Sequence, residues 1–132
     1  MFDEKVVVRF KDGTTLRGFG DNFMPGDADI LVQDLDDHLH TVMLRDVKLV
    51  CFVKEFTSED HNGHERLARL IYQPVPGRTV EITFRDGEKL QGVTTLSTKP
   101  TGGFFVTPLN PHSNNVHIFV NSDEILSFRF LN

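Results

Sequence analysis

The sequence predicts an all-β fold made of two copies of one five-strand pattern. Two observations carry this prediction: apolar and polar residues alternate in short segments, and the same segments return later in the chain. The alternation is clear at Val6, Val8 and Phe10, which share one face, while Arg9 and Lys11 point to the other. A period of two residues is typical of a strand with one buried face.

A tight turn follows this first strand. Asp12 and Gly13 form the turn signal, because glycine readily adopts the positive φ that such turns require. In the next strand, Gly18 is expected to allow the bend that closes a small barrel. Three more strands are predicted in the first copy at residues 29–33, 39–44 and 49–54, with a 3₁₀ turn at residues 45–48.

The second half of the chain repeats this pattern. The segment Val6–Gly13 matches Val80–Gly87, which begins 74 residues later. Beyond the third strand, a turn that is two residues longer raises the offset to 76, so that Leu49–Phe52 matches Ile125–Phe128. Agreement at so many spaced positions indicates an internal duplication. We expect one barrel repeat at residues 1–56 and a second at residues 78–132.

The segment between the copies, residues 57–77, breaks the strand pattern. It begins with a polar, turn-rich stretch, and Leu67, Leu70 and Ile71 then recur at helical spacing. This spacing favours a short helix whose apolar face packs on the barrels. Pro74 and Pro76 end any helix in this linker.

Five short strands, an early Asp-Gly turn, a bend glycine and a short turn before the fifth strand resemble the Sm-like (LSm) fold and, more broadly, SH3-like small barrels. Leu44-Arg45-Asp46 is similar to the Ile-Arg-Gly of the second Sm motif, with Asp in place of Gly. The resemblance implies two tandem five-stranded Sm-like barrels and RNA binding in which Arg45 helps to hold a base. The loops at residues 21–28 and 97–102 lack the Asp-x-φ-Asn sequence of RNA-binding members.

The charge balance disfavours RNA as a partner. The formal net charge is −5, and residues 1–56 carry 11 acidic and 7 basic side chains. Nucleic-acid affinity rests largely on Lys and Arg that neutralise phosphates.

The single cysteine, Cys51, excludes an intramolecular disulfide, and its apolar neighbours favour a buried thiol. The chain begins without a signal-peptide pattern, and no apolar run approaches the length of a membrane span. We therefore expect a cytoplasmic protein without membrane contact.

Candidate metal ligands cluster at residues 34–40. His38 and His40 are alternate residues that share a face of a strand, so both imidazoles can reach one ion, with Asp36 as a further ligand. The alternative is a solvated hairpin tip. No serine or cysteine lies in a nucleophile motif, and no glycine loop is placed to cradle a phosphate. We expect no enzymatic activity and no cofactor.

Two loops are the best candidates for binding. Phe23 and Met24 are apolar residues of the loop at residues 21–29, whereas His112 and Asn114 belong to a polar loop of the second copy. Exposed apolar loop residues can mark partner contacts, and loops often carry function. The alternative is that Phe23 and Met24 close the open end of the barrel.

These observations predict a non-enzymatic regulatory or scaffolding module that acts through contacts with a protein or a small ligand. Two alternatives stay open: an RNA-binding Sm-like protein, and a metal-dependent protein that uses His38 and His40. Unpaired strand edges also favour pairing between chains, and hence a homo-oligomer.

Overall fold

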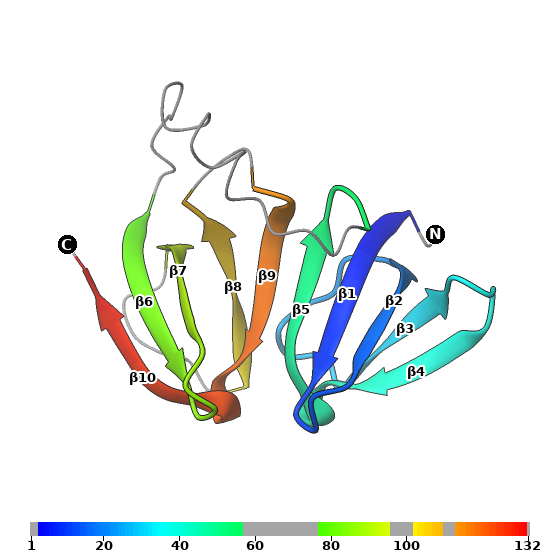
Figure 1. Cartoon of the computed structure of the whole chain (residues 1–132), viewed down its shortest axis with the longest axis horizontal. Coiled ribbons are helices and arrows are strands. Elements are labelled where there is room, and N and C mark those ends of the chain that lie inside the picture. The colour runs from blue at the N-terminus through cyan, green and yellow to red at the C-terminus, as the bar shows by residue number, and fades with distance from the viewer. Residues whose placement is uncertain (1–2, 57–76, 96–101, 110–112, 132) are drawn as a thin grey trace.

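The computed structural model describes residues 3–56, 77–95, 102–109 and 113–131, which form ten strands and two 3₁₀ turns (Figure 1). The first half holds β1 (Glu4–Phe10), β2 (Thr15–Gly20), β3 (Asp29–Asp34), β4 (Leu39–Met43) and β5 (Val47–Val53). The second half holds β6 (Arg78–Phe84), β7 (Lys89–Thr94), β8 (Gly103–Pro108), β9 (Asn115–Asn121) and β10 (Ile125–Phe130). The turn η1 (Leu44–Asp46) precedes β5, and η2 (Ser122–Glu124) precedes β10.

The described strands join one antiparallel sheet in the order β10-β6-β7-β8-β9-β5-β1-β2-β3-β4. The two halves meet where β9 pairs with β5, in the middle of Figure 1. Strands β4 and β10 consequently stand at opposite ends of the sheet.

The alternating pattern of the sequence explains the opening strand of each half. Val6 and Val8 of β1 are fully buried, and Val7 between them is only partly covered. The turn after β1 forms as predicted: Gly13 has a φ of 92°, and the Asp12 carboxylate accepts hydrogen bonds from the backbone N–H and hydroxyl of Thr14. The turn after β6 is similar, with a φ of 94° at Gly87.

The two glycines predicted to bend the second strand of each half lie where neighbouring backbones approach closely. A Cβ at Gly18 would lie 2.2 Å from the carbonyl oxygen of Gln33 on β3. A Cβ at Gly92 would lie 2.2 Å from Cγ1 of Val106 on β8. Real Cβ contacts are not this short, so only glycine fits at either position without moving the adjacent strand.

The strand pairings of the two halves follow one register. Strands β1 and β2 pair as β6 and β7 do 74 residues later. Val8 pairs with Val50, whereas its counterpart Ile82 pairs with Phe128, so the last strands correspond at an offset of 78. The sequence-based offset of 76 is therefore wrong by two residues. A slip of two residues keeps every side chain on the same face, so the apolar pattern fits nearly as well at either offset.

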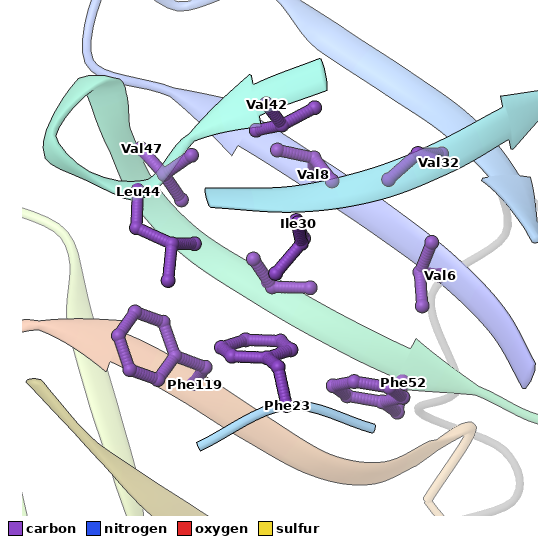
Figure 2. Close-up of a cluster of buried hydrophobic side chains, with 11 residues drawn as sticks. Val6, Val8, Phe23, Ile30, Val32, Val42, Leu44, Val47, Phe52 and Phe119 are labelled. Carbon is purple, nitrogen blue, oxygen red and sulfur yellow. The ribbon is translucent and has the colours of Figure 1, made fainter. Parts of the chain in front are cut away.

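Buried side chains form two clusters, one in each half, and each cluster includes a residue of the other half. Phe119 of β9 belongs to the cluster of the first half, where the rings of Phe119, Phe23 and Phe52 lie in a row (Figure 2). Leu49 of β5 belongs to the cluster of the second half, beside Val80 and residues of β8–β10. The junction between β5 and β9 therefore lies between two cores that extend across it.

The prediction of an all-β fold is confirmed for the described residues. Strand pairing unites them in one sheet, so two tandem barrels stay a prediction, as does the barrel-closing role of Gly18. The expected linker helix falls on residues 57–76, outside the described residues. In the described segments, no helix has the length and apolar character needed to cross a bilayer.

Candidate functional site

The two halves line an open groove of about 740 Å³ beside the junction of β5 and β9. The first half contributes the loop between β2 and β3 and the turn η1, and the second half contributes the start of β8 and the end of β9. We call this open groove the junction groove. Its lining residues are Pro25, Gly26, Asp27, Ala28, Met43, Leu44, Arg45, Gly102, Gly103, Phe104, Phe105, Phe119, Asn121 and Asp123.

Backbone hydrogen bonds hold the walls of the junction groove in place. The N–H of Leu44 donates to the carbonyl of Ala28 at 3.0 Å, which ties η1 to the loop before β3. In the second half, the N–H of Ser122 donates to the carbonyl of Gly102 at 3.3 Å. Each wall is thus fixed by main-chain contacts, and the side chains that face the groove are presented from ordered backbone.

The apolar part of the groove continues into the first core. The ring of Phe119 packs on Phe23 and on Phe105, with centroids 5.1 Å and 5.6 Å away. Phe105 also contacts Phe23 at 5.5 Å. Aromatic side chains combine a large apolar surface with little conformational freedom, so this part of the groove suits an apolar group of a ligand.

Asn121 joins the two halves at the groove. Its side chain is 4% exposed, and its Nδ2 donates to the carbonyls of Val47 at 2.8 Å and Leu44 at 3.3 Å. Its Oδ1 accepts from the backbone N–H of Asp123 at 3.0 Å. These contacts occupy the amide, so Asn121 positions η1 against β9 and is not free to hold a ligand.

Three exposed charged side chains line the groove: Arg45, Asp27 and Asp123. The Asp27 carboxylate accepts a hydrogen bond from the N–H of Met24. The Arg45 guanidinium has no hydrogen bond or ion pair within the part of the chain that is described. A guanidinium beside an apolar surface can hold a carboxylate or carbonyl of a ligand whose apolar part enters the groove.

A second polar cluster crosses the junction beside β5. Lys48 is 5% exposed, and its Nζ contacts Asp86 at 2.7 Å and also Glu88. It lies 4.6 Å from the ring centroid of Phe84, and Arg9 adds an ion pair with Glu88 at 3.1 Å.

These contacts set the pKa of both carboxyls in the Lys48 cluster. The hydrogen bond from Lys48 lowers the pKa of Asp86. Burial by itself raises the pKa of Glu88, but Lys48 and Arg9 together lower it. The cluster satisfies its own charges and so serves to join the two halves.

The candidate metal ligands do not assemble as predicted. His40 Nε2 lies 2.7 Å from Oδ2 of Asp34, and His38 Nδ1 lies 3.8 Å from the same oxygen. Asp36 contributes only its backbone N–H, which donates to Asp34. The hydrogen bond from His40 and those from the backbone lower the pKa of Asp34 to about 2. Among the described residues, no group of three or more His, Cys, Asp and Glu side chains is arranged to hold a metal ion.

The structure places the predicted binding residues in different surroundings. Arg45 lines the groove, whereas Phe23 is buried in the first core and Met24 is 69% exposed outside the groove lining. Asn114 uses its amide on the backbone N–H and carbonyl of Glu55. His112 lies outside the described residues.

Sequence reasoning missed the second wall of the groove, which includes Phe105 and Asn121. One signal was available: Phe105 is an aromatic residue on the strand face opposite to that of Phe104 and Val106. Burial raises the pKa of the Cys51 thiol to about 12, so the thiol stays protonated at neutral pH.

The family model that matches this chain spans residues 2–132. The chain belongs to DUF6982, a family of unknown function. The match covers both halves and the junction between them, so the groove of this DUF6982 chain lies inside the region that defines the family. Among curated proteins, none matches the sequence significantly.

Proposed function

We propose that the chain is a non-enzymatic binding module that holds a short segment of a partner protein in the junction groove. The observation that carries this proposal is the groove itself: an apolar wall that includes Phe105 above the buried ring of Phe119, beside an Arg45 guanidinium that pairs with no described residue. Binding sites of this kind combine mostly apolar lining with a few polar groups that fix orientation. A peptide segment offers both an apolar side chain and backbone carbonyls.

The repeated strand order supports the finer interpretation of the fold as two Sm-like repeats. Each half runs fifth, first, second, third, fourth strand across the sheet, and the two halves share the offsets of 74 and 78 residues. In this interpretation the groove lies between neighbouring repeats. A partner segment bound there would contact both repeats, which suits a regulatory or scaffolding role.

RNA binding ranks second as a function. Arg45 favours it, since the Sm-like resemblance assigns that residue to a base. The carboxylates of Asp27 and Asp123 line the same groove, and the net charge of −5 repels phosphates. A peptide avoids this repulsion because it need not carry a negative charge at each residue.

The experiment selects peptides from a random display library on the full chain and measures their affinity by fluorescence anisotropy. Gly26→Trp and Ala28→Trp each place a large ring at the groove lining, and a Cβ at Gly26 meets no heavy atom within 4 Å. Gly26→Ala is the matched control, because it changes the same position without filling the groove. Arg45→Gln tests the polar contact, and mixed single-stranded RNA at low and moderate salt is the competing probe.

Selected peptides should bind the parent chain and the Gly26→Ala variant with equal affinity. Their affinity for each of the two Trp variants should be at least about tenfold lower. Arg45→Gln should lower the affinity of the chain for those peptides that carry a carboxylate. Peptides that bind the Trp variants as well as the parent chain would exclude the groove as the site. Salt-sensitive binding of RNA, lost in Arg45→Gln, would instead establish the second function.

A further inference from the structure

Exposed apolar side chains gather at the two ends of the sheet. Among the described residues, seven large hydrophobic side chains are exposed, and five of them lie on the β3–β4 hairpin or at β10. These five are Leu31, Leu35 and Leu39 at one end, and Leu126 and Leu131 at the other. Both ends are edges of the described sheet, with backbone groups that pair with no other described strand.

The edges carry few of the features by which soluble proteins prevent strand pairing, which are charged residues, proline or a bulge. The register of β10 shifts between Ile125 and Ser127, but β5 has the same irregularity between Val47 and Leu49 and still pairs with β9. Strand β4 has the sequence Leu-His-Thr-Val-Met, with no Lys, Arg, Asp or Glu. Strand β10 has a single charged residue, Arg129, which pairs with Glu81 on the neighbouring strand at 2.8 Å.

The chain already contains one contact of the kind that these edges could make. Strand β9 pairs with β5 in antiparallel register, with Val50 opposite Phe119 and Phe52 opposite His117. The rings of Phe52 and His117 stack with centroids 4.4 Å apart. The offset of 78 makes β4 the counterpart of β9, and β10 the counterpart of β5.

The two open edges are therefore the same pair of strands that already join inside the chain. Applying the register of the β5–β9 junction to them places Phe128 opposite Thr41 and Phe130 opposite Leu39. The exposure of the matching residues on β5, which is already paired, shows how far residues of β10 would be buried by this contact. Lys48 is 5% exposed where Leu126 is 64% exposed. Val53 is 9% exposed where Leu131 is 42% exposed.

We propose that the chain self-associates head to tail, with β10 of one copy paired to β4 of the next. The contact is heterologous, because it joins two different surfaces, and it therefore propagates as a ring or an open chain instead of stopping at a symmetric dimer. It rests on the repeated register and on the exposed edges, and it does not depend on the groove binding a peptide.

The contact between copies is weaker than the internal one. Counterparts of the apolar residues that cross the internal junction are polar at the open edges: Ser127 replaces Leu49, and Thr41 replaces Phe119. Less apolar surface is then buried, so association depends on protein concentration. We expect a dissociation constant of about 1–100 µM, which corresponds to a binding free energy of modest size.

One position allows the affinity to be moved in both directions. Lys48 contacts Asp86 across the internal junction, and the counterparts of these two residues are Leu126 and Asp12. Leu126→Lys recreates the ion pair between copies, whereas Leu126→Asp sets two carboxylates against each other. Leu39→Asp blocks the opposite edge. Met24→Asp is the control, since Met24 is 69% exposed and lies on neither edge.

The masses of these variants are measured by light scattering and analytical ultracentrifugation up to about 200 µM, about twice the upper end of the expected range of the dissociation constant. The parent chain and Met24→Asp should associate with rising concentration, and Leu126→Lys should do so at about tenfold lower concentration in low salt. Leu126→Asp and Leu39→Asp should each stay monomeric. Mixed together, those two monomers should form a heterodimer, because one intact β10 edge and one intact β4 edge remain.

A parent chain that stays at 15.0 kDa throughout that range would overturn the proposal. An association that survives in one of the two Asp variants would also overturn it, because that result indicates a symmetric contact of β4 with β4 or of β10 with β10. Far-UV circular dichroism and thermal unfolding of each variant show that it is folded. The heterodimer then gives a positive result that unfolding cannot imitate.

Discussion

Replacing Asn121 by alanine measures how strongly the two halves are joined at the groove. The substitution removes the 2.8 Å hydrogen bond to the buried carbonyl of Val47, the 3.3 Å contact with Leu44 and the acceptor for the N–H of Asp123. The carbonyl of Leu44 keeps a partner, because it also accepts the N–H of Val47. The main loss is therefore the bond to Val47.

A net hydrogen bond is worth about 1 kcal/mol, and a buried carbonyl deprived of its donor costs about 1 kcal/mol more. We expect Asn121→Ala to lower the free energy of unfolding by about 2 kcal/mol and the Tm by about 6 °C, at about 3 °C per kcal/mol for a chain of this length. Urea titration and thermal unfolding, both followed by circular dichroism, measure these quantities.

Asn114→Ala is the matched control for this experiment. Asn114 also makes two hydrogen bonds from its amide to backbone of the first half, but these bonds lie at the surface, where water can replace them. Its loss should be less than about 1 kcal/mol. If Asn121→Ala costs no more than Asn114→Ala, then the buried amide does not join the halves and the reasoning is refuted.

Two further predictions test other parts of the structure. The folded pKa of Asp34, about 2, lies below its ordinary value, so the carboxylate contributes stability above about pH 4 that is lost as the pH falls towards 2. An NMR titration of its carboxyl carbon should give that midpoint, and Asp34→Asn should remove this part of the acid sensitivity; a midpoint near 4 would contradict the contacts with His40. Gly92→Ala should cost about 3 kcal/mol in urea unfolding, because its Cβ meets Val106 and the backbone of Thr107, whereas Gly26→Ala should change little. Equal midpoints for the two glycine variants would show that β7 and β8 can separate at no cost.

Local pattern was sufficient to predict the strands and turns of each half. Val6 and Val8 alternate with less buried residues, and the Asp-Gly turns at Gly13 and Gly87 have the positive φ expected of them. The offset of the last two strands was wrong, since faces repeat every two residues and a slip of two leaves the pattern intact. Only hydrogen-bond pairing, such as Val50 opposite Val8, distinguishes 76 from 78.

The candidate site was predicted only in part, because it forms between segments far apart in the chain. Arg45 was found through its resemblance to a motif. Phe105 and Asn121 gain their roles from the pairing of β9 with β5, and nothing near them in sequence indicates that pairing. The histidines at positions 38 and 40 show the opposite case, in which a local pattern suggested a metal site but Asp34 takes their contacts within the hairpin.

The central position of β5 has a consequence for how the chain folds. Its residues, Val47–Val53, are almost all buried, and they need β1 on one side and β9 on the other. A ribosome delivers β1 before β5, but β9 only after the whole connecting segment and three further strands. In that interval a nascent chain displays an apolar edge with a single lysine, a surface prone to aggregate with other chains. During synthesis, pairing of β5 with β9 must wait until residues 115–121 are translated, and aggregation through β5 competes with it. The same competition applies to refolding from denaturant, so the yield of folded protein should rise as the protein concentration is lowered.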